Sequence, residues 1–399
     1  MKVFSSQEKK LYKDNIKIIC KAKQTVMITL KDAVLKKTAA ICIGCCLFTS
    51  GIHAQIDVPE FQVDVLNKFR TGVNISYYEN YWKKSSALLD QYDKLLQKVE
   101  LAHQIGFTTV RLPVSFDNYL ISGTNTINPE LIKELSEAYD YIDKHDMNLI
   151  ITYHYGQLYK KADQTRESLR IADMWSQLVK NFKGKGYNNL FFGLYNEPRI
   201  PADNWYFAKG KMMSVLRPLD QERYWIIGST DYNGIDAFVH LRVIPNDKKI
   251  IYTFHFYQPY IFTHQGADWD PDKTYIKVLP YPHNPAEMPP LPARAMTNDM
   301  QYNYYHYHTK GNKLFIASRI QRIYDWLVEH QVPVICTETG VINNVPQQYR
   351  ENYLSDATDV MTQYGIPVLV WDLDQTFTII DKNKTPLKSI VEWINAFNK

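Results

Sequence analysis

Residues 190–198 read LFFGLYNEP, an apolar run that ends at the acid Glu197 and a turn-forming proline. A short run of aliphatic and aromatic residues bounded by a turn signal is typical of a strand buried on both faces, as in a parallel sheet. Residues 332–340, VPVICTETG, repeat this pattern, with Glu338 before a glycine. The sequence therefore predicts two buried strands, each ending in a carboxyl group.

Six further β-prone runs accompany these two along the chain. The eight predicted strands are residues 71–76, 108–112, 148–153, 190–195, 223–227, 250–256, 333–337 and 366–371. Longer stretches with apolar residues at helical spacing separate them. The predicted helices include residues 88–105, 129–145, 167–182, 205–219 and 314–330.

Strand and helix in alternation, eight times over, favour parallel strands joined by crossover helices. Eight such units in about 340 residues match the size of a single-domain (β/α)8 TIM barrel of the α/β class. An open doubly wound sheet is the alternative, but no glycine-rich phosphate-binding loop follows the first run. Residues 265–312 form a long insertion after the sixth strand, rich in proline and tyrosine. We expect this insertion to overhang the face where the strands end.

Composition limits the classes of function. A formal net charge of +4 over 399 residues gives no electrostatic case for a nucleic-acid partner. Aromatic residues make up 14% of the chain, with 29 Tyr and 8 Trp. Much of that must be core, but a surplus of Tyr and Trp also suits flat apolar ligand faces such as sugar rings.

Residues 1–54 do not fit the barrel pattern and have the features of a leader. Two lysines precede an apolar run of signal-peptide length, which ends at the small residue Ala54. We expect the catalytic domain to span residues 55–399, and a start at Met27 would make residues 1–26 an upstream extension. The run is too short for a membrane span, so the leader predicts a secreted or periplasmic protein.

Cysteine usage agrees with export. Four of the five cysteines lie in the leader. As an alternative to a cleaved signal peptide, Cys45 or Cys46 could be the lipidated cysteine of a bacterial lipoprotein. The residues before them fit that signal poorly. Only Cys336 remains in the mature chain, which excludes an intramolecular disulfide and a cysteine-based metal site there. We expect Cys336 to be a small buried hydrophobe.

In a (β/α)8 barrel, the functional side chains gather where the strands end. The predicted strand ends carry Arg111, His154, Asn196, Glu197, His255, Tyr257, Glu338 and Trp371. Two carboxyl groups on that face are the minimum needed to hydrolyse a glycosidic bond. Taken singly, a strand-end acid is most often solvated or ion-paired, and a lone histidine is most often a satisfied near-core residue. Their joint presence in barrel order favours the functional interpretation.

The sequence resembles glycoside hydrolase family five. The resemblance rests on the motifs RLP, HxY and NEP, the strand-seven glutamate and the strand-eight tryptophan. This family holds the cellulase-like members of the retaining (β/α)8 glycosidases, and the resemblance covers about residues 66–397. Residues 262–267, FTHQGA, with Trp269, look like a segment found after strand six in secreted bacterial members. One departure is Thr339, which stands where phenylalanine commonly follows the strand-seven glutamate.

The resemblance implies a role for each residue. Glu197 would be the general acid/base with a raised pKa, and Glu338 the nucleophile that forms a covalent glycosyl-enzyme intermediate. Their carboxyl groups are expected about 5–5.5 Å apart, the spacing of a retaining enzyme. Arg111 and Tyr257 would hold Glu338 ionised. Asn196 would bind the sugar 2-hydroxyl, and Trp371 would stack on the sugar. His154 and His255 would line the site.

Further residues near the strand ends are candidates for subsites. Trp205 and Trp269 are the first candidates for sugar-stacking platforms, and the others are Tyr77, Tyr78, Trp82, Tyr155 and Tyr232. Asp372 and Asp374 follow the eighth strand, where each could bind a sugar hydroxyl, face solvent or cap a turn.

The implied function is a secreted retaining endo-β-1,4-glucanase that acts on a β-linked oligo- or polysaccharide as a monomer, with no cofactor or metal. A β-mannanase, or another β-glucan or xyloglucan hydrolase, stays open because these residues do not distinguish an axial from an equatorial 2-hydroxyl. A metal-dependent barrel hydrolase usually needs a His-x-His pair on the first strand, which here reads GVNIS. A non-catalytic carbohydrate-binding barrel would be expected to lack one of the two acids.

Overall fold

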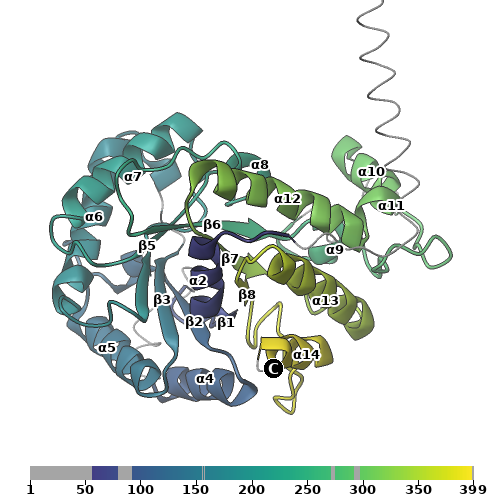
Figure 1. Cartoon of the computed structure of the whole chain (residues 1–399), viewed down its shortest axis with the longest axis horizontal. Helices are drawn as coiled ribbons and strands as arrows, with labels where there is room; N and C mark the ends of the chain where they lie inside the picture. The colour runs from purple at the N-terminus through teal and green to yellow at the C-terminus, as the bar shows by residue number, and fades with distance from the viewer. Residues whose placement is uncertain are drawn as a thin grey trace, which may run out of the picture. The chain divides into compact units, whose positions relative to one another are not determined.

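The computed structural model describes residues 56–79, 92–154, 156, 158–270, 275–291 and 297–397. Eight parallel strands form one closed barrel in sequence order, and pairing of the first strand with the last closes it (Figure 1). The strands are β1 (Thr71–Asn74), β2 (Thr109–Val114), β3 (Asn148–Tyr153), β4 (Leu190–Gly193), β5 (Trp225–Gly228), β6 (Ile250–Phe256), β7 (Val334–Thr339) and β8 (Val368–Val370). The prediction of a (β/α)8 barrel is confirmed.

Helices surround the strands, as Figure 1 shows. The long helices are α2 (Glu60–Phe69), α4 (Tyr92–Ile105), α5 (Pro129–Lys144), α6 (Gln164–Asn181), α7 (Ala202–Leu216), α12 (Lys313–His330), α13 (Gln347–Gln363) and α14 (Lys388–Phe397). The short ones are α8 (Ile235–Phe238), α9 (Tyr260–Thr263), α10 (Asn298–Tyr305), α11 (Tyr307–Lys310) and the 3₁₀ turns η1 (Phe116–Tyr119) and η2 (Leu158–Lys160). Of the described helices, none is both long and apolar enough to cross a membrane.

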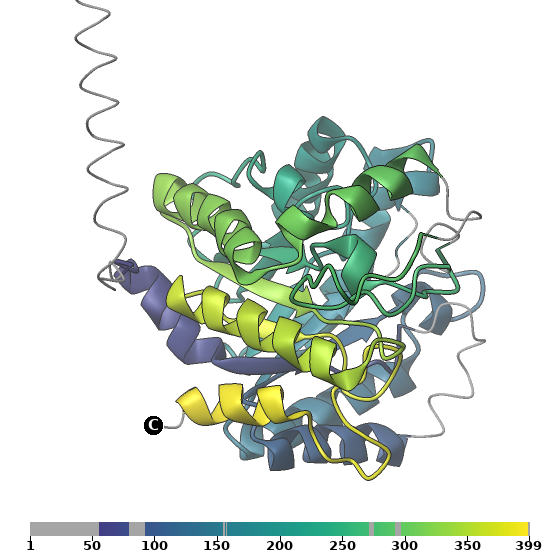
Figure 2. The ribbon, with the colours of Figure 1, turned by 90° about the vertical axis from the view of Figure 1, so that its right-hand side faces the viewer.

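Local chemistry sets several helix starts. The side chain of Asn128 accepts a hydrogen bond from the backbone of Glu130, and Pro129 occupies the first helical position of α5. Asp163 caps α6 and Asn312 caps α12 in the same way. In Figure 2, α12, α13 and α14 lie side by side on the face turned to the viewer.

The barrel interior has an apolar layer below a polar one. Side chains along each strand point alternately to the surrounding helices and to the barrel interior. Both sides are covered, so every strand is buried along its length. The apolar inner layer consists of Phe69, Ile150, Phe191, Ile226, Ile251, Ile335 and Leu369. The next inward positions toward the strand ends are polar, as in Arg111, Thr152 and His255. The closed apolar layer therefore leaves one polar end at which a site can form.

A register shift in β7 changes which way Glu338 points. Strict alternation from the inward Ile335 would put Thr337 inside and turn Glu338 toward the helices. Instead, the pairing with β6 runs from Phe254 opposite Cys336 to His255 opposite Glu338, so one residue of β7 is extra. Bulges of this kind re-aim side chains near active sites. Here the bulge places Glu338 level with His255 at the polar end.

The insertion after β6 packs mostly on the flank of the barrel. Tyr281 contacts Phe262 and Tyr353, and its hydroxyl donates to Asp356 of α13 at 3.0 Å. In Figure 1, α10 and α11 lie outside the ring, beyond α12 and α13. The described part from residue 275 onward therefore packs against α13. Trp269, near the start of the insertion, lies close to Phe377, which contacts Tyr257 after β6. The expectation that the insertion overhangs the strand ends stays a prediction.

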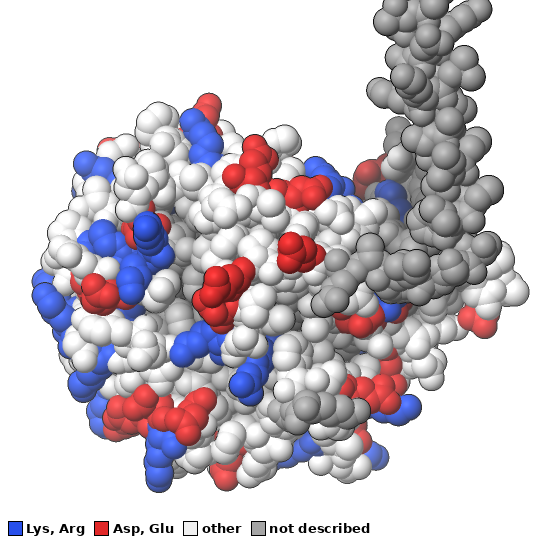
Figure 3. Space-filling model, in the orientation of Figure 1, with Lys and Arg blue, Asp and Glu red and all other residues white. Residues whose placement is uncertain are grey.

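Two other predictions concern the leader and Cys336. Residues 1–54 lie outside the described part, so the leader stays a prediction. Cys336 is fully buried, as predicted. Figure 3 shows acidic and basic side chains interspersed over the face that it presents.

Candidate active site

The structure brings all eight predicted strand-end residues to one end of the barrel. Arg111 comes from β2, His255 from β6 and Glu338 from β7, and the others lie within four residues after the ends of β3, β4, β6 and β8. Side-chain contacts connect them into one group, from Trp371 through His154 and Asn196 to Arg111, and on to Glu338, His255 and Glu197.

Glu338 is held by two hydrogen-bond donors. Nη1 of Arg111 donates to Oε1 at 2.6 Å, and the hydroxyl of Tyr257 donates to Oε2 at 3.0 Å. The Glu338 side chain is only 5% exposed. The ion pair with Arg111 and the two hydrogen bonds fix the direction of this carboxyl group.

Arg111 is itself fixed by three further acceptors. Its Nη1 also donates to Oδ1 of Asn74 at 2.7 Å, and its Nη2 donates to Oδ1 of Asn196 at 2.6 Å. Its Nε donates to the hydroxyl of Thr152 at 3.3 Å. Asn74 is a functional residue that the sequence reasoning missed. Its signal was an amide in the otherwise apolar first strand, TGVNIS.

Asn196 and His154 form the side of the site next to Trp371. Because Oδ1 of Asn196 accepts from Arg111, its amide nitrogen faces Nε2 of His154, at 3.3 Å. Burial lowers the pKa of His154 well below its usual value, and the nearby Arg111 lowers it further, so the ring is neutral. The ring stacks on Trp371 with centroids 5.5 Å apart. This chain of contacts sets the plane of the partly exposed indole.

Glu197 occupies a different environment from Glu338. Its backbone has a φ of 48°, a left-handed conformation that is strained for a residue with a Cβ. The side chain is 20% exposed, and its Oε1 lies 2.8 Å from Nδ1 of His255. Desolvation raises the pKa of Glu197 to about 7, against the opposing charges of Arg111 and Arg199. The protonated form is therefore populated near neutral pH.

The two carboxyl groups lie close together. One oxygen of Glu197 and one of Glu338 are within 4.8 Å of each other, and Nδ1 of His255 lies between them. Retaining glycosidases hold their carboxyl groups about 5–5.5 Å apart, whereas inverting enzymes leave about 6.5–9.5 Å for a water. The spacing is that of a pair that can form a covalent intermediate.

Residues 66–376 match the family described as Cellulase (glycosyl hydrolase family 5). The chain belongs to this family. It is therefore a glycoside hydrolase, and the carboxyl pair at the strand ends is its candidate active site.

Two curated relatives agree with the assignment to glycosyl hydrolase family 5. Endoglucanase 3 of Fibrobacter succinogenes is 26% identical over 83% of this chain, and the match spans 54% of that protein's length. Endoglucanase C of Acetivibrio thermocellus is 23% identical over 80% of this chain and 95% of its own length. The solved structure of endoglucanase Cel5A from Thermotoga maritima has the same fold, with a TM-score of 0.68 at 20% identity, covering 84% of this chain and 99% of that one.

Glu197, His255 and Glu338 are also a group that could hold a metal ion, the one such group among the described residues. Two observations disfavour that use in this glycosyl hydrolase. The guanidinium of Arg111, 2.6 Å from Glu338, would repel a divalent cation. Both oxygens of Glu338 also already accept hydrogen bonds. These three residues are better described as two carboxyl groups that both contact one histidine than as a metal site.

The predicted aromatic platforms divide into buried and exposed residues. Trp205 is only 1% exposed, and its indole donates to the carbonyl of Gly228 at 2.8 Å, so the prediction of a sugar platform there is wrong. The reason is that α7 begins at Ala202 and turns Trp205 toward the barrel. Tyr77 and Tyr78 are also buried, which contradicts their prediction as platforms. Trp82 and Tyr155 lie outside the described residues.

Trp269 and Tyr232 are exposed near the site. Trp269 is 55% exposed and lies 6.4 Å from Phe377, whose ring contacts Tyr257. Tyr232 is 49% exposed and lies under the guanidinium of Arg199. Tyr260, which the sequence reasoning missed, is 43% exposed and stacks on His264. These exposed rings are candidate sugar-binding surfaces near the site.

Asp372 and Asp374 have structural partners. Asp372 is buried, and its carboxylate accepts a hydrogen bond from the backbone of Gln375 at 2.6 Å, so it caps a turn. Asp374 forms an ion pair with Lys98 of α4. The turn-capping interpretation therefore holds for Asp372.

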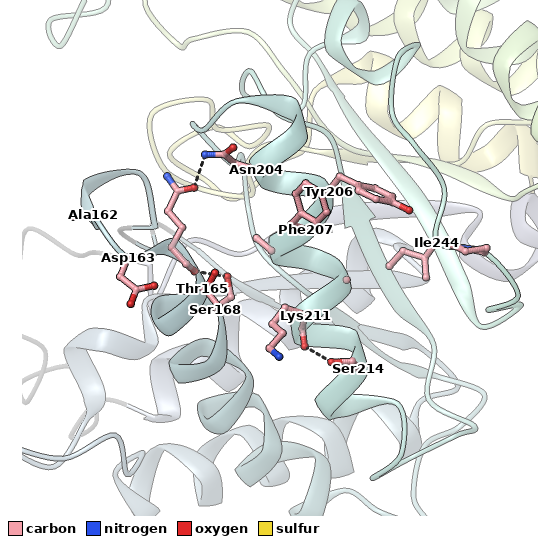
Figure 4. A pocket seen from close by; sticks show the side chains of 14 residues that line it. Ala162, Asp163, Thr165, Ser168, Asn204, Tyr206, Phe207, Lys211, Ser214 and Ile244 are labelled. Atoms are coloured by element: carbon pink, nitrogen blue, oxygen red, sulfur yellow. Dashed lines mark hydrogen bonds between the residues drawn. The ribbon is translucent and has the colours of Figure 1, made fainter.

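A groove of about 930 Å³ lies away from this site, along α7 (Figure 4). Its lining includes Tyr206 and Phe207 of α7, and Asn204, whose amide donates to Gln164 of α6 at 2.9 Å. None of the predicted catalytic residues lines this groove. The candidate active site rests on the side-chain geometry at the strand ends.

Proposed function

We propose that this glycoside hydrolase is a retaining endo-β-1,4-glucanase in which Glu338 is the nucleophile and Glu197 the general acid/base. The unequal environment of the two carboxyl groups carries the proposal. Glu338 is ion-paired with Arg111 and accepts a hydrogen bond from Tyr257, whereas burial raises the pKa of Glu197 to about 7. Two neighbouring carboxyl groups in such different environments can divide the roles of nucleophile and acid.

In the first step, a carboxylate oxygen of Glu338 attacks the anomeric carbon. The bond to the leaving oxygen breaks, and Glu197 delivers its proton to that oxygen. The product is a covalent glycosyl ester on Glu338. Loss of negative charge from Glu338 in this step leaves Arg111 and Tyr257 free to stabilise the ester oxygens.

In the second step, Glu197 is ionised and acts as a base. It takes a proton from a water molecule, whose oxygen attacks the anomeric carbon from the face that the leaving group has vacated. The ester bond breaks and Glu338 becomes a carboxylate again. Two displacements at one carbon give a product of retained β-configuration.

The proposed substrate rests on the relatives and on the exposed rings. Both curated relatives are endoglucanases by name. Trp371 lies against His154, the exposed Trp269 lies near Phe377, which contacts Tyr257, and the exposed Tyr232 precedes Asn233, which contacts His255. Several rings near the site support binding of a chain longer than one sugar. Asn196 accepts a hydrogen bond from Arg111, which is paired with Glu338, and this neighbourhood supports its proposed role as the residue that binds the 2-hydroxyl.

A product profile tests the proposal. The purified protein is incubated with β-1,4-glucan, mixed-linkage glucan, xyloglucan and mannan, and early products are followed by NMR and by viscosity. We expect β-1,4-glucan to lose viscosity faster than it gains reducing ends, with β-anomers appearing first. Cleavage of mannan or xyloglucan alone would replace the glucanase assignment, and early α-anomers would contradict retention. Glu197→Gln and Glu338→Gln are matched controls that keep shape and remove each acid.

We also propose that residues 1–54 are a leader and that the monomeric catalytic domain, residues 55–399, acts outside the cytoplasm. The supporting pattern is the apolar run that ends at Ala54. N-terminal sequencing of exported protein should give Gln55. A lipid-labelled protein that begins at Cys45 or Cys46 would instead support the lipoprotein alternative.

A further inference from the structure

The loop after β5 has an unusual backbone beside the active site. Asp231, Tyr232 and Asn233 have φ values of 52°, 56° and 56°, three consecutive left-handed residues, none of them glycine. Asparagine tolerates this conformation better than most residues do. The side chain of Asn233 lies over the end of β5, where a Cβ on Gly228 would come within 2.3 Å of its Oδ1. Asn233 is 1% exposed, so the loop buries an amide next to the site.

Asn233 contacts His255 through both its backbone and its side chain. The backbone N–H of His255 donates to the carbonyl of Asn233 at 2.9 Å. The side-chain Nδ2 of Asn233 lies 3.3 Å from Nε2 of His255. An amide nitrogen can only donate, so Nε2 of the histidine is the acceptor. In a neutral ring, the proton is then on Nδ1.

The ring is neutral at working pH. Burial lowers the pKa of His255 to about 4; Glu338 acts in the opposite direction and Arg111 in the same one. Its Nδ1 faces Oε1 of Glu197 at 2.8 Å and Oε2 of Glu338 at 3.4 Å. With the proton on Nδ1, the ring donates to Oε1 of Glu197.

We propose that Asn233 is a positioning residue that fixes the tautomer of His255 and thereby keeps the acid proton of Glu197 on Oε2. This inference rests on the proposed role of Glu197 as the general acid. While Oε1 accepts from the histidine, the proton of the neutral carboxyl group stays on the other oxygen, where it can reach the leaving group. In the opposite tautomer, Nδ1 would be an acceptor and would draw the proton of Glu197 onto Oε1, away from the substrate.

The test begins with wild-type protein and a readout that does not depend on activity. Long-range ¹H–¹⁵N NMR of the full chain identifies the protonated nitrogen of His255, and His255→Gln assigns the signals. We expect a pyrrole-like Nδ1 and a pyridine-like Nε2. A pyridine-like Nδ1 in the wild type would overturn the proposal whether or not the protein cleaves glucan. If the tautomer is as expected but no glucan is cleaved, the proposed function fails and the assignment of Asn233 stands.

The variants test the catalytic consequence. Asn233→Gly keeps the left-handed backbone and the carbonyl that accepts from His255, and removes only the amide. Asn233→Asp offers an oxygen to Nε2 and favours the opposite proton position. Asp231→Gly, in the same loop and with the same left-handed backbone, is the matched control. Thermal unfolding of each variant confirms that it is folded.

The readout is kcat/KM on two aryl cellobiosides that differ in leaving group. We expect Asn233→Gly to lower kcat/KM about tenfold for a poor leaving group and less than about twofold for dinitrophenolate, which needs no proton. Asn233→Asp should give the larger loss, and Asp231→Gly should keep the wild-type ratio. Equal losses on both substrates would mean that Asn233 only supports the fold, and the proposal would be wrong.

Discussion

Nη1 of Arg111 lies 2.6 Å from Oε1 of Glu338, and these two side chains, from β2 and β7, are 3% and 5% exposed. The two residues are 227 positions apart in the chain, and only closure of the barrel brings them together. Removal of one partner from a buried ion pair leaves an uncompensated charge, which is more costly than the pair itself is stabilising. The pair therefore links the stability of the barrel to the position of the Glu338 carboxyl group.

Replacing Arg111 should lower both stability and activity. We expect Arg111→Met to reduce the free energy of unfolding by about 3–5 kcal/mol, because it leaves the Glu338 carboxylate buried without its charge partner. Urea unfolding and kcat/KM measure the two effects. Arg322→Ala is the control: its pair with Asp236 is exposed, so it should cost less than about 1 kcal/mol and leave activity unchanged. Equal costs for the two variants would contradict the role of the buried pair.

Removal of the proposed nucleophile should abolish double displacement. We expect Glu338→Ala to lose more than about 10³-fold in kcat on glucan, because no covalent ester can form. Azide, added with an activated aryl glycoside, should enter the vacated space and give an inverted α-glycosyl azide. Proton NMR of the products decides the question. A product of retained configuration from this variant alone would exclude Glu338 as the nucleophile.

The strand order and the two glutamates could be predicted from sequence, but their orientation could not. Alternation along β7 points Glu338 outward, and only the register shift opposite His255 turns it inward. Asn74 was missed because a lone amide in an apolar strand gives no sign of the arginine that it will meet. Trp205 was misplaced because α7 starts three residues before the predicted helix, and that start decides which face the indole joins.

The two tryptophans should respond to truncation in opposite ways. Trp205→Ala leaves a cavity behind the barrel and should cost about 3–5 kcal/mol of unfolding free energy. Trp269→Ala should change stability by less than about 0.5 kcal/mol, but raise KM for long cello-oligosaccharides about fivefold, because an exposed ring is removed from the rim. Thermal unfolding and KM as a function of chain length separate the effects. An unchanged KM for every length would remove Trp269 from the substrate path.

The fall of kcat/KM at alkaline pH, the alkaline limb, should be controlled by the ionisation of Glu197. The first step needs the protonated acid, and burial raises the pKa of Glu197 to about 7, so kcat/KM should fall as pH rises through 7. Arg199 is exposed and lowers the pKa of Glu197, so Arg199→Gln should move the limb upward by roughly a few tenths of a pH unit. The pH profile of kcat/KM, measured at constant ionic strength, tests the sign. A downward move would show that another group controls this limb.

Buried acids near β1 and β8 should make stability decrease as pH rises. Burial raises the pKa of Glu79 and of Asp372 to about 7, whereas in the unfolded chain both ionise near pH 4. Between these values the unfolded state binds fewer protons than the folded state, so the free energy of unfolding falls from about pH 4 to about pH 7. Glu79→Gln and Asp372→Asn resemble the protonated forms and should each reduce the fall between about pH 5 and about pH 7.5 by roughly 2–3 kcal/mol. Urea unfolding at pH 5 and pH 7.5 measures it, with the exposed Glu392→Gln as control. If both variants keep the wild-type difference, these carboxyl groups are already ionised in the folded protein.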